Sequence, residues 1–285
     1  MEEKNSVERR RTKKFLNFLL DTRGQAIGTT AKIVFNKAVY LAARTVRRTP
    51  EVGLVHADWH WAKYPFSLRH RILWSSALRG WFIPEDESAI ECMLHMPSYE
   101  PIEWVAPIQG EYFLDAGGYV GWYSIQAARA VGNSGGVVTL EPDPLNRRQL
   151  EVNLSLNKLE NVRILPLAIW SSSGSVRWQQ GEEPVWHQIS EVGETTQESI
   201  SVDDLIRSLG LSRLDWIKLD IEGGEVEALR GAERTLREYC PKLFIEVHGT
   251  TQIVAKLLQE VGYTISRELY DQPPDRHGWI LAEKL

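Results

Sequence analysis

The sequence contains only two cysteines in 285 residues, Cys92 and Cys240, and they lie too far apart to form a CxxC pair. This scarcity excludes a disulfide-rich scaffold and a cysteine-based zinc site, and it favours a reducing compartment such as the cytoplasm. No apolar run approaches the roughly 18 residues that a membrane-spanning helix needs. The first residues also lack the successive charged, apolar and small-residue regions of a secretory signal. We therefore expect a cytoplasmic protein without a membrane span.

Charge is unevenly distributed along the chain, although the net charge is only −5. Residues 1–50 contain 12 Lys and Arg against 4 Asp and Glu, so the remaining residues carry a net −13 on the same count. Such a basic arm can bind an anionic membrane surface, or it can be an ordinary solvated helical face. We keep both readings open and expect no nucleic-acid partner.

The segment that follows the basic arm is rich in tryptophan and proline. Within residues 51–110 the tryptophans are Trp59, Trp61, Trp74, Trp81 and Trp104. Because tryptophan side chains mostly bury area, we expect residues 1–82 to form a basic, Trp-rich helical extension or cap. Residues 83–285 then form the main domain, entered through a short amphipathic helix over 83–96.

From residue 112 onward, apolar strand-like runs alternate with helical patterns. The predicted strands are 112–115, 137–141, 162–167, 214–220, 242–248 and 263–266, and the predicted helices are 122–131, 144–157, 203–209, 225–239 and 251–261. This alternation predicts an α/β fold with a mostly parallel sheet and helices on both faces. Residues 170–200 interrupt it and predict a hairpin-like excursion. Ser201 with Asp204 has the spacing of a helix N-cap, and Gly210 and Gly262 stand where helices should end.

The stretch FLDAGGYVGWYS, residues 113–124, predicts a strand, a glycine-rich turn and a helix in immediate succession. Asp115 ends the strand, and the turn contains Gly117, Gly118 and Gly121. Glycines let the backbone approach a bound nucleotide-like ligand closely, with amide N–H groups free to face it. We therefore predict a cofactor cradle at this turn.

Glu141 ends the next predicted strand and can accept hydrogen bonds from both hydroxyls of a ribose. A dinucleotide or S-adenosylmethionine would satisfy this acid. The sequence of the turn distinguishes these two cofactors, because the GxGxxG fingerprint of a dinucleotide site would place glycine where Asp115 or Ala116 stands. An acid on that rim repels a pyrophosphate and suits the ammonium and sulfonium charges of S-adenosylmethionine. The methyl donor is favoured, with an NAD-dependent oxidoreductase as the alternative.

Charged residues also alternate along the two later strands. Lys218 and Asp220 share one face of their strand, Glu222 follows, and the next strand carries Glu246 and His248. Charges within a parallel sheet are costly unless they are paired, so we expect Lys218 to compensate Asp220 or Glu246. Asp220 and His248 lie nearest the strand ends, where such sheets bind ligands, and are the catalytic candidates.

These segments together resemble the FkbM-type S-adenosylmethionine-dependent methyltransferases, from about residue 84 to residue 266. The segments that carry the resemblance are the cradle, the LEPDP step, LDIEGGE and the closing IEVH. The resemblance implies a Rossmann-like class I methyltransferase fold, with a seven-stranded sheet whose last strand is antiparallel and can be supplied by HGWILAEKL. It also implies methyl transfer to oxygen, commonly a hydroxyl of a sugar, glycolipid or other small molecule.

Carried over by position, the resemblance places the cofactor at the cradle and at the ends of the next two strands. The implied cofactor-binding residues are Asp115, Gly117, Gly118, Gly121, Glu141, Pro142 and Ala168. Asp220 and Glu222 occupy the family's acidic motif after the fourth strand. The chain departs from the family pattern in two places: the turn reads AGGYVG in place of a GAN-like segment, and Trp170 stands where a small polar residue or aspartate commonly follows the third strand.

A hydroxyl acceptor needs a base, and His248 is the first candidate because a neutral imidazole accepts a proton near pH 7. Asp220 is the second candidate. A divalent metal on Asp220, Glu246 and His248 would lower the hydroxyl's pKa instead, and is the less favoured alternative. The acceptor pocket is predicted to include Glu222, Trp186 and His187. A non-catalytic binding protein on the same fold remains a further alternative.

Overall fold

The computed structural model describes residue 31 and residues 68–98, 100–179, 188–189, 195–270 and 277–284. The chain divides into two compact units, Met1–Glu100 and Pro101–Leu285. Apart from Ala31, which is helical, the basic arm lies outside the described residues. The cap over residues 1–82, its boundary with the main domain and the arm's membrane contact therefore stay predictions. Within the described residues, every helix is too short or too polar to cross a bilayer.

The described part of the first unit contains a hairpin and a short helix. Strands β1 (Leu73–Ser75) and β2 (Gly80–Phe82) pair antiparallel and place Trp74 opposite Trp81, with edge-on rings 5.1 Å apart. Residues 73–82 thus form a hairpin and not the helix expected there, because the paired indoles favour a two-stranded ribbon. The predicted helix is confirmed over fewer residues as α3 (Glu87–His95), which Asp86 caps and which leads into a 3₁₀ turn (Met96–Ser98).

The second unit begins with a 3₁₀ turn (Ile102–Trp104) and contains a seven-stranded sheet in the order β12-β13-β11-β10-β3-β4-β5. Its strands are β3 (Tyr112–Ala116), β4 (Gly136–Leu140), β5 (Val162–Leu165), β10 (Trp216–Leu219), β11 (Lys242–His248), β12 (Thr264–Tyr270) and β13 (His277–Glu283). β13 pairs antiparallel with both of its neighbours, and the pairs from β11 to β5 are parallel. The predicted mostly parallel sheet with an antiparallel last strand is confirmed.

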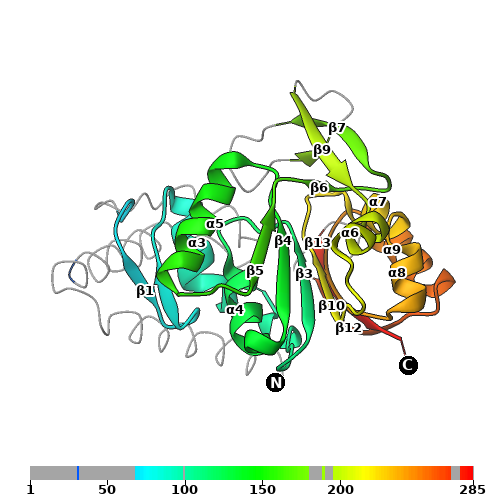
Figure 1. Ribbon diagram of the computed structural model, residues 1–285, viewed down its shortest axis with the longest axis horizontal. Coiled ribbons are helices and arrows are strands. Elements are labelled where there is room, and N and C mark those ends of the chain that lie inside the picture. Colours follow the sequence, from blue (N-terminus) through cyan, green and yellow to red (C-terminus); the bar gives the residue numbers. More distant parts are fainter. Residues whose placement is uncertain are drawn as a thin grey trace, which may run out of the picture. The chain divides into compact units, whose positions relative to one another are not determined.

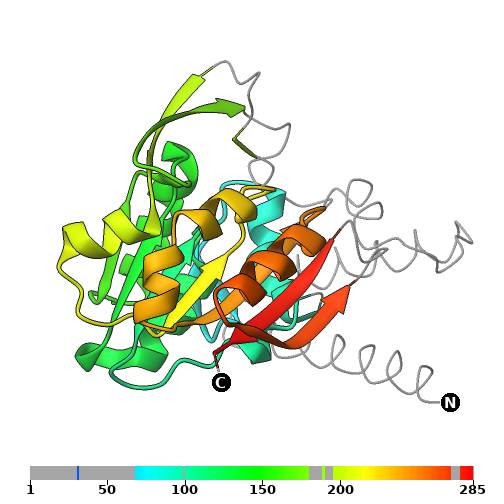
Figure 2. The ribbon, with the colours of Figure 1, turned by 90° about the vertical axis from the view of Figure 1, so that its right-hand side faces the viewer.

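Helices cover both faces of this sheet (Figure 1). On one face lie α4 (Trp122–Val131), a 3₁₀ turn (Gly132–Ser134) and α5 (Pro144–Leu156); on the other lie α6 (Val202–Leu209), α7 (Glu225–Arg230), α8 (Glu233–Glu238) and α9 (Thr251–Glu260), which face the viewer in Figure 2. Alternate side chains of β3 serve the two layers, since Phe113 packs with α4 and Leu114 packs with the helices of the opposite face. Both faces of β3 are therefore buried.

The single helix predicted over residues 225–239 is two helices, and this expectation was wrong. Gly231 separates them, and a Cβ on this glycine would lie 2.3 Å from the carbonyl oxygen of Trp170. The Gly231 carbonyl also accepts a hydrogen bond from Asp203 N–H at 3.0 Å, which ties this break to the start of α6. The break therefore lets α7 and α8 pack closely against the start of the excursion.

The predicted excursion is confirmed as a small sheet with the order β6-β9-β7-β8. Its strands are β6 (Ala168–Ile169), β7 (Gly174–Gln179), β8 (Gln188–Ile189) and β9 (Thr195–Ile200). β7 and β9 rise beyond the end of the main sheet at which β5 leads into β6 (Figure 1). Trp186 and His187, predicted to line the acceptor pocket, lie outside the described residues.

The predicted N-cap of α6 at Ser201 can be tested by mutation. Ser201 Oγ accepts the N–H of Asp204 at 3.2 Å, as the spacing predicts. We expect Ser201→Ala to lower the free energy of unfolding by about 1 kcal/mol, because one N-terminal N–H of α6 loses its acceptor. Urea unfolding followed by circular dichroism measures the loss. Ser208→Ala, near the other end of α6, is the matched control and should change stability little; equal effects would refute the capping role.

Candidate functional site

The glycine turn after β3 is held between two neighbouring strands. A Cβ on Gly117 would lie 1.9 Å from the backbone oxygen of Asp220, and Gly117 has a φ of +84°. A Cβ on Gly118 would lie 2.2 Å from Thr139 Cγ2. Both positions therefore require glycine, because backbone and a buried threonine occupy the space of any side chain.

The turn's amide groups are already used, contrary to the expectation that they are free. The N–H groups of Gly117 and Gly118 both donate to the carbonyl of Leu140, at 3.1 and 3.0 Å, and Gly121 N–H donates within the turn. Tyr119 N–H donates to Glu141 Oε2 at 2.6 Å, and Tyr119 adopts a φ of +44°. These hydrogen bonds hold the turn against the end of β4 and fix its backbone. Tyr119, the residue that donates to Glu141, has a left-handed backbone conformation.

Glu141 follows β4 and is nearly enclosed, with 5% of the residue exposed. Its Oε1 accepts the N–H of Asp143 at 3.0 Å, and Asp143 in turn caps α5 ahead of Pro144. Arg147 Nη1 donates to the carbonyls of Glu141 and Pro142, both at 3.0 Å, and so holds this step in place. Burial raises the pKa of Glu141 to about 7, although the two backbone N–H donors oppose the rise.

Asp115 lies beneath the turn and is fully buried, rather than on its rim as expected. Its Oδ2 accepts the hydroxyl of Ser124 at 2.6 Å, and that hydroxyl also lies 2.7 Å from Thr139 Oγ1. Its Oδ1 lies 3.4 Å from Lys218 Nζ and has no hydrogen-bond partner among the described residues. Burial raises the pKa of Asp115, against the opposing charge of Lys218.

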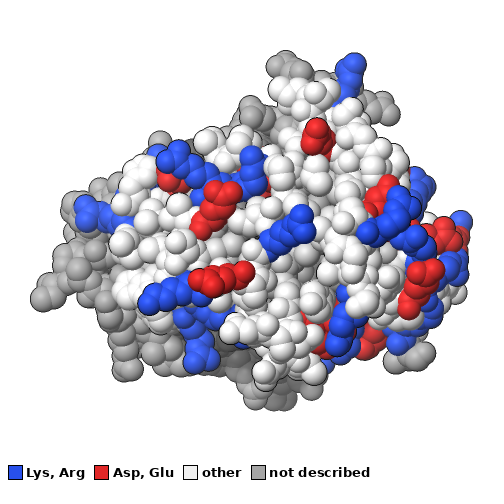
Figure 3. Space-filling model, in the orientation of Figure 1, with Lys and Arg blue, Asp and Glu red and all other residues white. Residues whose placement is uncertain are grey.

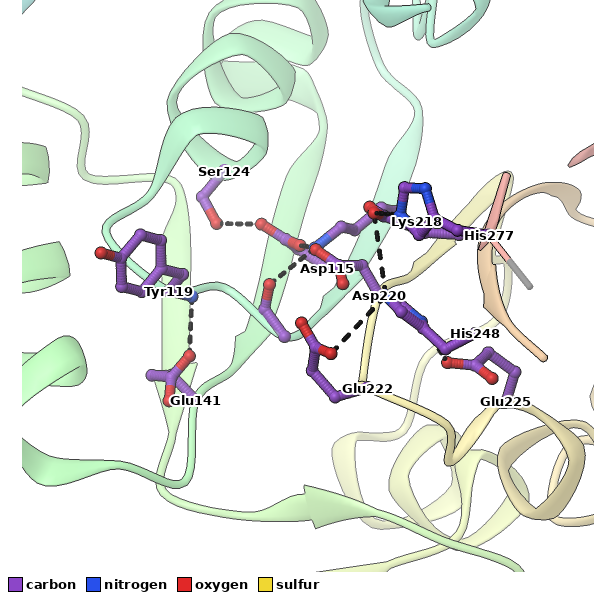
Figure 4. Close-up of polar contacts among 12 residues, drawn as sticks. Asp115, Tyr119, Ser124, Glu141, Lys218, Asp220, Glu222, Glu225, His248 and His277 are labelled. Carbon is purple, nitrogen blue, oxygen red and sulfur yellow. Dashed lines mark hydrogen bonds and ion pairs between the residues drawn. The ribbon is translucent and has the colours of Figure 1, made fainter. Parts of the chain in front are cut away.

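Lys218 links this buried acid to the rest of the site (Figure 4). Its Nζ donates to the carbonyl of Gly117 at 2.6 Å and lies 3.2 Å from Asp220 Oδ2. The side chain is 3% exposed, so the ammonium is almost completely removed from water. Lys218 was expected to compensate Asp220 or Glu246; it compensates Asp220 together with Asp115, while Glu246 contacts histidines.

The LDIEGGE segment forms a tight turn after β10. Asp220 is 31% exposed, and Glu222 has a φ of +53° and a 28% exposed side chain. Glu225 begins α7 with a fully buried side chain, and its Oε1 accepts the N–H of Gly223 at 2.8 Å. Two of the three acids therefore reach the solvent-accessible side of the turn, and the third supports the turn from inside.

His248, at the end of β11, is surrounded by carboxylates. Its Nδ1 lies 3.1 Å from Glu225 Oε1, and its Nε2 lies 3.6 Å from Glu222 Oε2 and 3.8 Å from Glu246 Oε1. Burial disfavours the charged ring, but the hydrogen bond that the ring donates to Glu225 and the charges of Glu246 and Glu222 outweigh burial and raise the pKa of His248. Burial also raises the pKa of Glu222, against the attraction of His248.

A second histidine, His277 at the start of β13, joins the cluster. His277 Nε2 lies 2.6 Å from Glu246 Oε1, and the ring centroids of His277 and His248 are 5.3 Å apart. The metal ligands expected from the sequence, Asp220, Glu246 and His248, are not one group. Among the residues that the structure describes, the potential ligand atoms instead fall into two groups, each within 4.8 Å: Glu246, His248 and His277, and Asp220, Glu222 and His248.

Sequence reasoning missed the roles of Glu225 and His277. Glu225 belongs to the LDIEGGE segment, so its proximity to Asp220 was evident from the sequence. That its side chain points inward depends on where α7 begins, which the sequence did not show. His277 could be found only from the antiparallel register that sets it opposite His248. Ala168, a predicted cofactor contact, is buried at the start of β6 and pairs with Ser199.

A glycine turn between β3 and α4, an acid after β4 and a polar cluster after β10 and β11, on this strand order, define a class I methyltransferase fold. The chain belongs to the FkbM methyltransferase family, because the family model described as the methyltransferase FkbM domain matches residues 115–265, more than half of the chain. It is therefore a methyltransferase.

Two curated relatives illustrate the similarity. Methyltransferase sdnD of Sordaria araneosa is 23% identical over 211 residues, which cover 61% of this chain and 81% of the relative. Hexuronic acid methyltransferase AglP of Haloferax volcanii is 30% identical over 103 residues, which cover 34% of this chain and 43% of the relative. The second similarity is therefore confined to about a third of this chain.

Two solved structures are also similar. Methyltransferase FkbM from Methylobacillus flagellatus KT shares 22% identity with a TM-score of 0.46, over 61% of this chain and 43% of that chain. Fibrillarin from Aeropyrum pernix, solved with natively bound S-adenosylmethionine, shares 15% identity with a TM-score of 0.42, over 62% of this chain and 68% of that chain.

The burial of the Lys218 ammonium group allows a prediction about stability. We expect Lys218→Met to lower the free energy of unfolding by about 3 kcal/mol, because Asp115 is left buried without its cation. Urea unfolding measures the loss, and Lys256→Met on the exposed face of α9 is the control, with no measurable change expected. Adding Asp115→Asn should restore part of the loss, since it removes the uncompensated charge. Additive losses in the double variant would refute the pairing.

Proposed function

We propose that the protein is an S-adenosylmethionine-dependent O-methyltransferase that acts on a hydroxyl of a sugar, a glycolipid or another small molecule. The observation that carries this proposal is the position of Lys218, which joins the glycine turn to Asp220 through hydrogen-bonding and ionic contacts of 2.6 and 3.2 Å. The donor's cradle and the acidic cluster are therefore parts of one connected site at the carboxyl edge of the sheet.

Glu141 is the residue that selects the donor in this proposal. Each carboxylate oxygen can accept more than one hydrogen bond, so Glu141 can bind ribose hydroxyls while it keeps the N–H groups of Tyr119 and Asp143. The carboxylate disfavours a phosphorylated ribose by repulsion. Family membership favours methyl transfer over the NAD-dependent oxidoreductase alternative.

The class of acceptor is inferred from a relative. The Haloferax volcanii protein is described as a hexuronic acid methyltransferase, which supports a sugar-like hydroxyl as the acceptor here. We expect no nucleic-acid partner, and on the face in Figure 3 basic and acidic side chains lie interspersed. Location in the cytoplasm, and contact of residues 1–50 with a membrane surface, remain part of this proposal.

Methyl transfer needs mainly positioning, because the sulfonium of the donor is already an activated leaving group. When bound, the donor would supply its methyl group to an acceptor oxygen that the site holds at near-attack distance, with the O–C bond forming as the S–C bond breaks. The hydroxyl proton must pass to a base, and Asp220 takes this role in our proposal. Both ring nitrogens of His248 face carboxylates, whereas Asp220 is 31% exposed and adjoins the glycine turn.

Glu141 gives the donor's affinity a pH dependence. We expect S-adenosylhomocysteine to bind about tenfold more weakly at pH 6 than at pH 8, because the raised pKa of Glu141, about 7, means that the carboxylate is protonated at the lower pH. Isothermal titration calorimetry measures both affinities. Glu141→Gln should bind weakly with little pH dependence. If the affinity of Glu141→Gln still depends on pH, the titrating group is not Glu141. Thermal stabilisation by NAD and not by S-adenosylhomocysteine would overturn the cofactor assignment.

Asp220→Asn tests the base and the reaction. We expect the variant to keep S-adenosylhomocysteine binding and to lose roughly 10² to 10⁴ in turnover, because the acceptor's proton has no base. Cells that produce the wild-type protein should contain products heavier by one methylene, and cells that produce Asp220→Asn should lack them, as mass spectrometry of extracts will show. Asp204→Asn, on α6, is the control and should behave as wild type. Equal product from Asp220→Asn would remove the base role from Asp220.

A further inference from the structure

Three side chains from two strands converge at the end of the sheet beyond β10. β11 and β13 run antiparallel, and their register sets His248 directly opposite His277. Glu246 precedes His248 by two residues and therefore lies on the same face of β11. This cross-strand group belongs to the framework of the sheet, so the backbone ladder fixes the separation of its members.

We propose that Glu246, His248 and His277 form a binding site for a divalent first-row transition metal ion. One potential ligand atom from each residue lies within 4.8 Å of the others, and His277 Nε2 and Glu246 Oε1 are 2.6 Å apart. Two imidazoles with one carboxylate are a donor set that suits Mn²⁺, Fe²⁺ or Zn²⁺. Mg²⁺ prefers oxygen ligands alone and should bind more weakly.

The orientation of His248 is an observation separate from the cluster's composition. Its Nδ1 is held by Glu225, which is fully buried and also accepts the hydroxyl of Thr250 at 2.9 Å. Metal-binding histidines commonly donate one ring N–H to such a carboxylate, which fixes the ring and leaves the other nitrogen for the ion. Here that other nitrogen, Nε2, faces Glu246 and Glu222.

The solvent-accessible side of the site is negatively charged. Asp220 and Glu222 form a second group with His248, again within 4.8 Å, and their side chains are 31% and 28% exposed. They attract a cation toward His248 while three protein ligands leave coordination positions open. Resting on the proposed function, the inference is that the acceptor hydroxyl occupies one of these positions, where the ion makes its proton easier to transfer to Asp220.

The test measures metal binding directly, without donor or acceptor. Mn²⁺ is titrated into the full-length protein, and the free ion is followed by electron paramagnetic resonance. We expect saturable binding that is at least tenfold weaker in His277→Gln and roughly 10- to 100-fold weaker in Glu225→Gln, which removes only the partner of His248. His70→Gln, whose side chain is 68% exposed in the first unit, is the histidine control and should bind as wild type.

Circular dichroism establishes that each variant is folded, and Glu246→Gln replaces His277→Gln if the latter is not. Equal Mn²⁺ affinity in wild type and in the folded ligand variant would overturn the proposal. Weaker binding in Asp220→Asn with unchanged binding in His277→Gln would overturn it as well, because the ion would then belong to the other group. A protein that binds Mn²⁺ as expected but transfers no methyl group would refute the proposed function and leave the metal site standing.

Discussion

The site depends on one buried ammonium group. Lys218 is 3% exposed, and its Nζ contacts the Gly117 carbonyl, Asp115 and Asp220. A charge in such a place is tolerated only because carboxylates and a carbonyl surround it. The glycine turn, Asp115 on the strand beneath it and Asp220, which we propose as the base, therefore all contact the same ammonium group. A change at any one of them alters how the charge of Lys218 is compensated by the others.

The sequence was sufficient for most of the fold, because strand and helix patterns in this chain are strong and local. β11 and α4 were predicted with their observed bounds, and the antiparallel last strand was expected from the family resemblance. The prediction failed where distant backbone decides local structure. Gly231 breaks a helix because Trp170 approaches it, and the hairpin at Trp74 and Trp81 depends on a pairing that composition alone does not reveal.

The site was predictable in its acids and not in their directions. Asp115, Glu141, Asp220 and His248 all lie at the carboxyl edge, but Asp115 faces inward and Glu141 binds the turn's own backbone. Because carboxylates face both ring nitrogens of His248, our proposal assigns the base to Asp220, and His248 as the base stays a prediction. The same carboxylates that stabilise a proton on this ring would also stabilise the proposed metal ion. A proton and the ion therefore compete for His248 Nε2.

The position of β13 in the sheet has a consequence for how the protein is made. β13 is inserted between β11 and β12, yet it follows both of them along the chain. His277 is therefore supplied only after every other strand of the sheet has been synthesised. Because chains emerge from the ribosome in order, β3, β4 and β10, which carry the glycine turn and its acids, are synthesised before the second histidine of the pair. The proposed metal cluster can therefore assemble only once β13 pairs with β11.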